Sequence, residues 1–391
     1  MDYLRRTWAD VSLDHLSHNY EALRCTVPSS CRFLGIVKAD AYGHGAVPIS
    51  HHLAELGAEY LAVSNLEEAI QLRRGEVRLP ILILGYTPPR YVRGMVEMGI
   101  SQEVHSLEYA RALNEQLSGT GQRLTVHLKL DTGMGRLGFF CREGQPVLEE
   151  LLEISRMEHL LVEGMFTHFP AADSLDPEDV AFTRSQFETF CSFINAMDGA
   201  HARPEICHCC NSGATILYPE YALDMIRPGI ATYGIAPSRS LEGRLDLRPL
   251  MTLRSSISQI RQYPAGVSVS YGRSYVTPCP KTLAVVCIGY ADGLSRRLSG
   301  RVSFLLHGIP VPVVGRICMD MCMIDITDVP EAKVGDKVTI MGAGRDGVSS
   351  VRDLAQQLNT IPYEILCDIN KRIPRIYLDG KKQREILQYI V

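Results

Sequence analysis

The 391-residue sequence lacks a surplus of charge of either sign, since 40 lysine and arginine residues face 44 aspartate and glutamate residues. Proteins that bind nucleic acid or an anionic membrane surface usually carry a basic excess, so we expect neither kind of partner. The sequence also lacks an apolar run of about 18 residues, which a membrane-spanning helix would need. Its first residues show no apolar stretch of the signal-peptide kind. We therefore expect a soluble, cytoplasmic protein.

Paired metal-ligand spacings are missing as well. The 12 cysteines are irregularly spaced, which argues against a disulfide framework and favours a reducing compartment. The segment CHCC at residues 207–210 and the pair Cys318 and Cys322 suggest a metal site at first sight. A structural zinc ion usually takes two paired ligand units, and adjacent strand residues point to opposite faces. We expect small buried residues there and no metal.

The first two-thirds of the chain alternates apolar runs with helical patterns, and no Gly-x-Gly-x-x-Gly motif indicates an open dinucleotide-binding sheet. Asn65 and Thr87, the latter followed by Pro88, are placed to cap helices, and a further helix is expected after Pro177. Eight strands separated by helices, over about 230 residues, predict a (β/α)8 barrel of the TIM type. The eight expected strands span residues 33–39, 60–65, 81–86, 101–105, 124–131, 161–169, 206–212 and 225–234.

The pattern changes at about residue 245. Alternating segments at residues 252–261, 283–288, 301–306 and 319–326 are joined by Gly, Pro and Asp turns, which predicts a mostly β domain. One helix is expected there, from about residue 350 to 358. We assign residues 11–244 to the barrel, residues 245–391 to the C-terminal β domain, and residues 1–10 to an N-terminal strand that joins the latter.

Barrel enzymes place their active sites at the C-terminal ends of the strands. Lys38 closes the first apolar run, and a buried neutral lysine is the nucleophile that imine-forming chemistry requires. A lysine paired with Asp40 at the barrel rim explains the same position equally well, so the residues alone leave both interpretations open. The other expected strand ends carry Asn65, Tyr86, His105, Lys129 with Arg136, His168, Ser212, and Arg227 with Gly229.

The segment VKADAYGHG, which contains Lys38, resembles the cofactor-lysine motif of the alanine racemases. The resemblance extends over nearly the whole chain, and its segments follow the family order. It implies an amino-acid racemase that depends on pyridoxal 5'-phosphate. The further matching segments are WADVSLDHLSHNY, LDTGMGRLGF, THFPAAD, CHCCNSGA, MIRPGIATYG, SVSYGRSYV, IGYADG, VGRICMDMCMIDIT and IPYEI.

The resemblance implies how the cofactor is held. Lys38 would carry it covalently, and Arg227 would face its ring nitrogen. A guanidinium does not readily give up a proton, so Arg227 would donate a hydrogen bond without protonating the ring. An ordinary structural role also remains open for each implied residue. The hydroxyl groups named below could be buried with their hydrogen bonds satisfied, and Arg227 could form an ion pair at the barrel rim. The implied phosphate ligands are Tyr42, Ser212, Tyr363 and the backbone around Gly229 and Ile230.

Racemisation needs a proton removed from one face of a carbon and another delivered to the opposite face, so two acid–base groups are the simplest solution. The resemblance implies that Lys38 serves the D-amino acid and Tyr271 the L-amino acid. His168 is the family residue beside that tyrosine. The tyrosine comes from the other subunit of a head-to-tail homodimer, so each site would be shared. Without the family context, Tyr271 would be an ordinary strand residue.

Substrate contacts are implied for Arg136 and for the backbone N–H of Met319, which would hold the carboxylate in two-point fashion. Lys129 matches a position that is carbamylated in some family members, where the carbamate orients the arginine. Plain packing of Lys129 against Asp131 is the alternative. Two further positions match residues that line the access route to the site: Tyr290 and Asp320.

The expected reaction is the interconversion of L-alanine and D-alanine for peptidoglycan. A serine racemase of the vancomycin-resistance type shares these motifs, but the bulky phenol of Tyr363 favours the smaller substrate. A pocket rejects one added hydroxyl only modestly, so this preference is not absolute. Two other classes stay open: a non-catalytic pyridoxal-phosphate-binding barrel, which resembles the first domain alone, and a cofactor-free imine-forming aldolase barrel.

Overall fold

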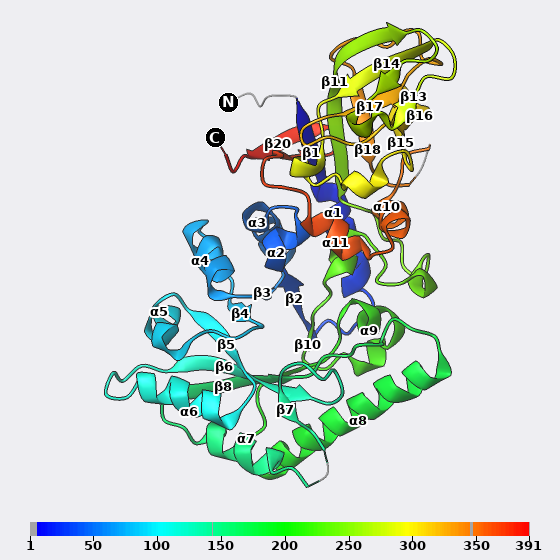
Figure 1. Cartoon of the computed structure of the whole chain (residues 1–391). Helices are drawn as coiled ribbons and strands as arrows, with labels where there is room; N and C mark the ends of the chain where they lie inside the picture. Colours follow the sequence, from blue (N-terminus) through cyan, green and yellow to red (C-terminus); the bar gives the residue numbers. More distant parts are fainter. Residues whose placement is uncertain (1–5, 143, 345–346, 391) are drawn as a thin grey trace. The chain divides into compact units, whose positions relative to one another are not determined.

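The computed structural model describes residues 6–142, 144–344 and 347–390. The chain divides into two compact units (Figure 1). The barrel unit comprises Ser17–Ala41 and Ala46–Leu247, and the β unit comprises Met1–Leu16, Tyr42–Gly45 and Arg248–Val391. The expected fold class, a TIM-type barrel with a mostly β domain after it, is confirmed.

The barrel unit is built on eight parallel strands in the order β10-β2-β3-β4-β5-β6-β8-β9. Backbone bonds from Asp224 N to Cys207 O (3.0 Å) and from Arg227 N to Cys210 O (2.8 Å) link the two end strands, as barrel closure requires. The short β7 (Phe139–Phe140) pairs with β6. The barrel strands are β2 (Arg32–Ile36), β3 (Tyr60–Val63), β4 (Ile81–Ile83), β5 (Ile100–Val104), β6 (Leu124–Asp131), β8 (Leu160–Phe166), β9 (Ile206–His208) and β10 (Met225–Ile226).

Helices alternate with these strands, and two of the expected helix starts are confirmed. Asn65 Oδ1 accepts from Glu68 N (3.0 Å), and Asp176 Oδ1 accepts from Glu178 N (2.9 Å), as N-caps do. The expected start at Thr87 is wrong, because a 3-10 turn at Pro89–Tyr91 comes first. The helices are α1 (Leu13–Arg24), α2 (Lys38–Tyr42), α3 (Ala46–Leu56), α4 (Leu66–Arg74), α5 (Val92–Glu97), α6 (Leu107–Gln116), α7 (Val147–Ser155), α8 (Pro177–Gly199) and α9 (Ser212–Leu217).

The strand expected to run to residue 39 ends at Ile36, so Lys38 lies on the turn that follows it. The next four residues, Ala39 to Tyr42, all have φ between 50° and 55°. A left-handed turn costs an L-residue roughly 1–2 kcal/mol per position, so its surroundings must hold it in place. Asp40 Oδ1 contributes by accepting from Ala46 N at 2.9 Å.

The β unit contains a nine-stranded sheet in the order β14-β17-β16-β15-β18-β11-β1-β19-β20. Strand β1 (Thr7–Ser12) lies inside this sheet, antiparallel to β11 and parallel to β19. A separate hairpin is formed by β12 (Ser268–Val269) and β13 (Tyr275–Val276). The remaining strands are β11 (Met251–Tyr263), β14 (Lys281–Val286), β15 (Ser303–Leu306), β16 (Ile309–Val314), β17 (Cys322–Asp325), β18 (Lys337–Met341), β19 (Arg375–Asp379) and β20 (Lys382–Leu387).

Two α-helices accompany this sheet, although only one was expected. The predicted helix is α10 (Val351–Leu358), which Ser350 caps by accepting from Asp353 N. The missed helix is α11 (Pro362–Cys367), whose six residues are too few to show a helical period in the sequence.

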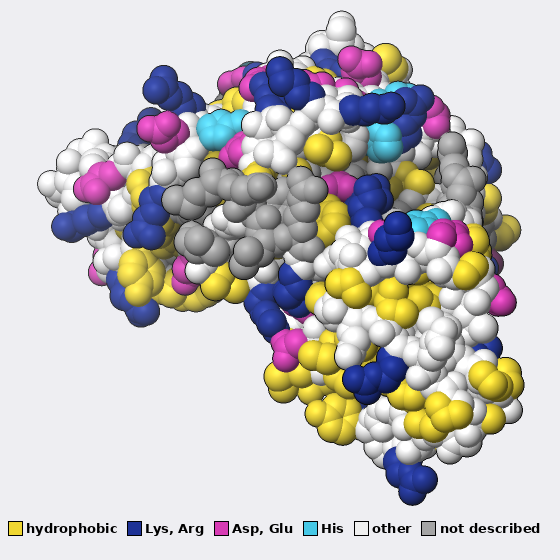
Figure 2. All heavy atoms as spheres, turned by 90° about the horizontal axis from the view of Figure 1, so that it is seen from above, with side chains coloured by type: hydrophobic (Ala, Val, Ile, Leu, Met, Phe, Trp, Pro, Cys, Tyr) yellow, Lys and Arg dark blue, Asp and Glu magenta, His cyan; other side chains and the backbone are white. Residues whose placement is uncertain are grey.

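Within the described residues, no helix has the length and apolar character needed to cross a bilayer. On the face shown in Figure 2, basic and acidic side chains are interspersed.

Candidate active site

The barrel unit carries its candidate side chains at or just beyond the C-terminal ends of its strands. Lys38 follows β2, Lys129 lies near the end of β6, and His168 follows β8. Ser212 and Arg227 follow β9 and β10. Strand ends on a rigid barrel hold side chains in fixed positions, which is why barrel active sites lie there.

His168 lies among positive charges. Its pKa is held well below the usual value, first because burial disfavours the charged imidazole and then because of Arg227, Arg136, Lys129 and Lys38. The four cations are therefore close enough to act on one imidazole. His168 is neutral near pH 7, so it can accept or donate a hydrogen bond without adding charge.

Lys129 is 4% exposed, and its pKa is lowered to about 8, mainly by burial. Arg136 and the other neighbouring cations lower it further, while Glu103 opposes them. Its Nζ lies 5.5 Å from the centre of the Phe166 ring. Asp131, the partner considered in the sequence, accepts instead from backbone amides of the following loop.

That loop carries Arg136, and its shape depends on glycine. Asp131 Oδ1 accepts from Gly133 N and Gly135 N, both at 3.0 Å. Gly138 has φ 130°, and a Cβ there would come within 2.7 Å of Asp131 N. The segment DTGMGRLG thus folds back over the end of β6 and brings Arg136 close enough to influence Lys129.

Arg227 is 4% exposed and has no carboxylate partner among the described residues, so it makes no rim ion pair there. Its Nη1 lies 2.8 Å from His208 Nδ1, and its Nη2 donates to Thr167 O (2.7 Å) and Cys209 O (3.2 Å). The guanidinium carbon lies 5.3 Å from the centre of the Phe166 ring. Burial lowers its pKa to about 10, which still leaves it protonated at neutral pH.

Ser212 and the loop after β10 form a buried group of donors. Ser212 Oγ accepts from Gly229 N (2.8 Å) and Ala231 N (3.2 Å), so its own hydrogen is directed elsewhere. Ile230 begins a short 3-10 helix directly after Gly229, and Ser212 begins α9. A buried hydroxyl with a hydrogen to donate, next to the starts of two helices, suits a phosphate group.

Two predicted phosphate ligands lie together in the β unit. The rings of Tyr42 and Tyr363 meet edge-on, with their centres 5.8 Å apart. The pKa of Tyr42 is raised, first by burial and then by Tyr363 and Cys367. Tyr42 therefore keeps its proton at neutral pH and remains a hydrogen-bond donor.

Tyr271 projects from the turn of the β12–β13 hairpin, and it is 67% exposed. The turn is held by Ser270, whose Oγ donates to Arg316 O (2.7 Å) and accepts from Arg316 N (2.9 Å). A Cβ added at Gly272 would lie 3.2 Å from Arg316 Nη1, so the arginine side chain lies against this turn.

The remaining predicted residues of the β unit lie on two adjoining loops. Tyr290 and Met319 are 42% and 53% exposed, and Ala291 N donates to Met319 O at 2.9 Å. Met319 was expected in a strand but precedes β17, which begins at Cys322. Asp320 accepts from Arg372 Nη2 at 2.8 Å.

The barrel unit's residues match what pyridoxal phosphate requires. That cofactor presents an aldehyde, a dianionic phosphate and a ring nitrogen. Lys38 supplies an amine, the buried Ser212 hydroxyl accepts from two amides and can direct its own hydrogen to an anion, and Arg227 is a guanidinium that no carboxylate among the described residues neutralises. This donor set fits the cofactor.

The cysteine-rich segment at residues 207–210 makes other contacts. The sulfur of Cys209 lies 3.3 Å from Tyr221 O, and that of Cys207 lies 3.9 Å from Pro204 O. Both ring nitrogens of His208 bond to side chains, His127 and Arg227. Across the parts of the chain that the structure describes, no three metal-ligating side chains are arranged for an ion.

Functional reasoning from the sequence missed three connected residues: the buried His127 and His208, and the half-buried Glu163. His208 entered it only as a possible metal ligand. Both histidines are fully buried, and they connect to Arg227 inside the barrel. The available signal was a titratable residue inside a predicted strand, but only the structure shows which way its side chain points.

A parallel barrel with a lysine and two arginines at its strand ends, followed by an antiparallel β unit, defines a barrel enzyme with an appended β domain. Residues 11–237 match the alanine racemase N-terminal domain, and residues 250–377 match the alanine racemase C-terminal domain. The chain belongs to the alanine racemase family.

Named relatives agree over nearly the full length. The alanine racemase of Desulfovibrio desulfuricans is 43% identical over 375 residues, covering 96% of this chain and 99% of that one. That of Desulfosudis oleivorans is 41% identical over 380 residues, covering 95% and 97%. The structure of alanine racemase from Clostridium difficile 630 superposes with a TM-score of 0.93 at 37% identity, with both chains covered in full. The structure of alanine racemase from Bacillus anthracis with bound L-Ala-P superposes with a TM-score of 0.92 at 34% identity, covering 100% of this chain and 99% of that one.

Proposed function

We propose that this chain interconverts L-alanine and D-alanine with pyridoxal phosphate and so supplies D-alanine for peptidoglycan. The observation that carries the proposal is a group of four cations, Lys38, Lys129, Arg136 and Arg227, around a neutral His168; Lys129 and Arg227 in this group are buried. A phosphate-bearing cofactor and a substrate carboxylate are both anions, and a group of this kind binds and orients both. Full-length similarity to alanine racemases supports the same reaction.

When bound, pyridoxal phosphate acidifies the α-hydrogen of an amino acid by drawing electrons from the α-carbon. Lys38 Nζ removes or returns the proton on one face, for the D-amino acid, and the Tyr271 hydroxyl does so on the other face, for the L-amino acid. Arg136, with the backbone N–H of Met319, orients the substrate carboxylate. Arg227 donates to the ring nitrogen and keeps its own proton, because its pKa of about 10 lies well above neutral pH.

The phosphate is held in the proposal by Ser212, Tyr42, Tyr363 and the backbone of Gly229 and Ile230. Ser212 supports this role, because its oxygen already accepts two amide hydrogens and its own hydrogen can point to an anion. The raised pKa of Tyr42 also fits a donor. Tyr290 and Asp320 line the access route.

Lys129 is proposed as a carbamylation site. Its pKa of about 8 leaves part of the amine neutral at mildly alkaline pH, and the neutral amine is the form that reacts with carbon dioxide. Protein equilibrated with ¹³C-bicarbonate should give a carbamate carbon signal that Lys129→Ala abolishes and Lys333→Ala keeps. A signal unaffected by Lys129→Ala would contradict the assignment.

We further propose that the enzyme is a homodimer in which Tyr271 of the partner subunit completes each site. Tyr271 is 67% exposed, which suits a residue that a second surface must cover. Loss of optical rotation of pure L-alanine tests the activity itself, and L-serine in the same panel tests the substrate.

Co-expression of two inactive chains tests the shared site. Lys38→Ala dimers and Tyr271→Ala dimers should each be almost inactive. In a mixed dimer both defects fall in one site, and the other site is intact. Random pairing of equal amounts makes half the dimers mixed, so about a quarter of all sites should recover, from two-fold symmetry alone.

Different affinity tags on the two chains prove that mixed dimers form. The control pairs Lys38→Ala with itself under both tags, which should recover nothing. No recovery in purified mixed dimers would refute the shared site and leave Tyr271 as a same-chain base or a structural residue.

A further inference from the structure

A continuous chain of side-chain hydrogen bonds runs through the barrel interior, from Arg227 towards the N-terminal ends of the strands. Arg227 Nη1 lies 2.8 Å from His208 Nδ1, and His208 Nε2 lies 2.9 Å from His127 Nδ1. His127 Nε2 lies 3.1 Å from Glu163 Oε2, and the hydroxyl of Tyr60 donates to the same oxygen. Five residues on five strands or strand ends thus form one connected path.

The direction of every bond follows from the chemistry of its ends. A guanidinium can only donate, so His208 Nδ1 must accept, and a neutral His208 then carries its hydrogen on Nε2. That hydrogen is donated to His127 Nδ1, which places the hydrogen of a neutral His127 on Nε2, facing Glu163. Burial lowers the pKa of both imidazoles, and the bonds from His127 and Tyr60 lower that of Glu163. Each N–H therefore points towards the carboxylate.

The backbone of β8 is shaped for this path. Val126 of β6 is opposite Val162, but the next residue, His127, is opposite Gly164, so Glu163 is the extra residue of a β-bulge. Bulges re-aim a side chain, and they are frequent near active sites. A Cβ at Gly164 would lie 2.2 Å from His127 Nδ1, so only glycine leaves room for that ring.

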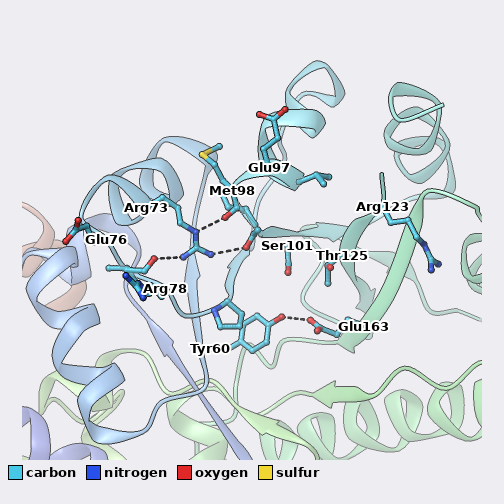
Figure 3. A pocket seen from close by; sticks show the side chains of 15 residues that line it. Tyr60, Arg73, Glu76, Arg78, Glu97, Met98, Ser101, Arg123, Thr125 and Glu163 are labelled. Atoms are coloured by element: carbon cyan, nitrogen blue, oxygen red, sulfur yellow. Dashed lines mark hydrogen bonds between the residues drawn. The ribbon is translucent and has the colours of Figure 1, made fainter. Parts of the chain in front are cut away.

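The carboxylate end of the path reaches solvent. Tyr60 and Glu163 line a cleft of about 720 Å³ at the N-terminal ends of the strands, and Figure 3 shows their side chains pointing towards each other. The Glu163 side chain is 28% exposed, whereas those of His127 and His208 are completely buried. Arg73 in the same cleft is bonded to four backbone carbonyls, which fixes the wall.

We propose that Glu163 is a positioning residue, which orients and polarises Arg227 through His127 and His208. Hydrogen bonds in a chain strengthen one another, so the carboxylate makes His208 Nδ1 a better acceptor for Arg227. The guanidinium is then held in one orientation and is partly neutralised without a carboxylate beside it. The consequence for catalysis rests on the proposed function, in which Arg227 faces the cofactor's ring nitrogen.

Proton and ¹⁵N NMR of histidine-labelled protein without cofactor tests the path directly. In the unaltered protein, His127 and His208 should both be neutral with the hydrogen on Nε2. Their signals are assigned by their loss in His127→Asn and His208→Asn. In Glu163→Gln the acceptor loses its charge, so both Nε2–H proton signals should move upfield. The matched control is Glu158→Gln, an exposed carboxylate just before β8, which should move neither signal.

Tyr60→Phe should shift the imidazole proton signals in the opposite direction. It also provides a test if Glu163→Gln does not fold. Without the tyrosine donor, the carboxylate becomes a stronger acceptor for His127, so the Nε2–H signals should move downfield. A residue that only packs would not produce opposite shifts from these two variants. Unmoved imidazole signals in a folded Glu163→Gln or Tyr60→Phe protein would overturn the proposal.

The holoenzyme supplies the second readout. Glu163→Gln should lower kcat about fivefold, the size of one neutral hydrogen bond, and leave KM for alanine within about twofold. Glu163→Asp should recover part of kcat. Shifted imidazole signals without any racemase activity in the unaltered protein would refute the proposed function and leave the hydrogen-bonded path intact. Shifted signals with unchanged kcat would refute the positioning role.

Discussion

The candidate residues of the barrel unit and those of the β unit differ in how they are held. Arg227 and Lys129 are each 4% exposed, and their partners are fixed by strands. Tyr271, Met319 and Tyr290 are 67%, 53% and 42% exposed, and they lie on short turns. Charges act strongly in a buried, rigid setting because little solvent screens them. The two buried barrel residues therefore lie where charge acts strongly, whereas these three exposed residues of the β unit would, in the proposed dimer, need a second surface to cover them.

The largest effect should come from the barrel side of this comparison. In the proposed mechanism, Lys38→Ala removes both the covalent anchor of the cofactor and one base, so racemisation should fall by at least about 10³-fold. Borohydride reduction of the native protein followed by peptide mapping should find the cofactor on Lys38 alone. Lys333→Ala, at an exposed lysine, serves as the control and should keep full activity. A labelled peptide without Lys38 would refute the assignment.

The next largest effect should come from low pH, which should destabilise the barrel unit more than the β unit, because the three histidines with depressed pKa values lie in the barrel unit. In the unfolded chain these side chains become protonated near pH 6.5, whereas in the folded chain they become protonated only at lower pH. Stability is therefore full above pH 6.5 and falls as the pH drops below it. Because of His168 and His208 together, the free energy of unfolding should fall by about 3 kcal/mol between pH 7.5 and 5.5, which chemical denaturation measures.

A pair of variants isolates one of these histidines. His168→Asn should flatten the pH dependence by about half of that amount. His201→Asn, at an exposed histidine of the same unit, should leave it unchanged. If stability depended equally on pH in the two variants, His168 would not be a group whose pKa is depressed by folding.

Packing inside the barrel provides a smaller effect. Gly164→Ala places a Cβ 2.2 Å from His127 Nδ1, so the ring or the strand must move, at a cost of about 1–3 kcal/mol in the free energy of unfolding. Gly199→Ala, at the end of α8 with no atom within 4 Å of the new Cβ, should be neutral or stabilise by up to about 1 kcal/mol. Denaturant titration distinguishes them, and equal stabilities would show that the His127 site tolerates the methyl group.

The smallest effect is expected from the β unit. Tyr363→Asn opens space beside Tyr42 and offers a polar partner for a hydroxyl, so the serine-to-alanine ratio of kcat/KM should rise about tenfold at most. Tyr91→Asn, at an exposed ring of the barrel unit, should leave the ratio unchanged. An unchanged ratio in Tyr363→Asn would show that this phenol does not set the preference.

The sequence located all eight barrel strands, most of them as the nearly continuous apolar runs that buried parallel strands show, although β5 and β6 also carry buried polar residues. Their ends were less predictable: the run through Lys38 continues past Ile36, since residues beyond a strand also pack into the core. The motifs placed Lys38, Ser212 and Arg227 at strand ends. The bulge at Glu163 and the connection of His127 to His208 could not be read from the sequence, because one extra residue changes which way a side chain points.

Strand β1 gives the order of synthesis a role in how this protein reaches its fold. It leaves the ribosome long before its two neighbours in the sheet, β11 and β19, which begin at Met251 and Arg375. The barrel sequence can begin to fold while β1 still has exposed edges, and an unpaired strand is a site for aggregation. A circular permutant that begins near residue 248 and joins residue 391 to residue 1 would place all three strands in one continuous part of the chain, with β20 between β19 and β1. In such a protein β1 would spend less time unpaired during synthesis, and no side chain of the site would be changed.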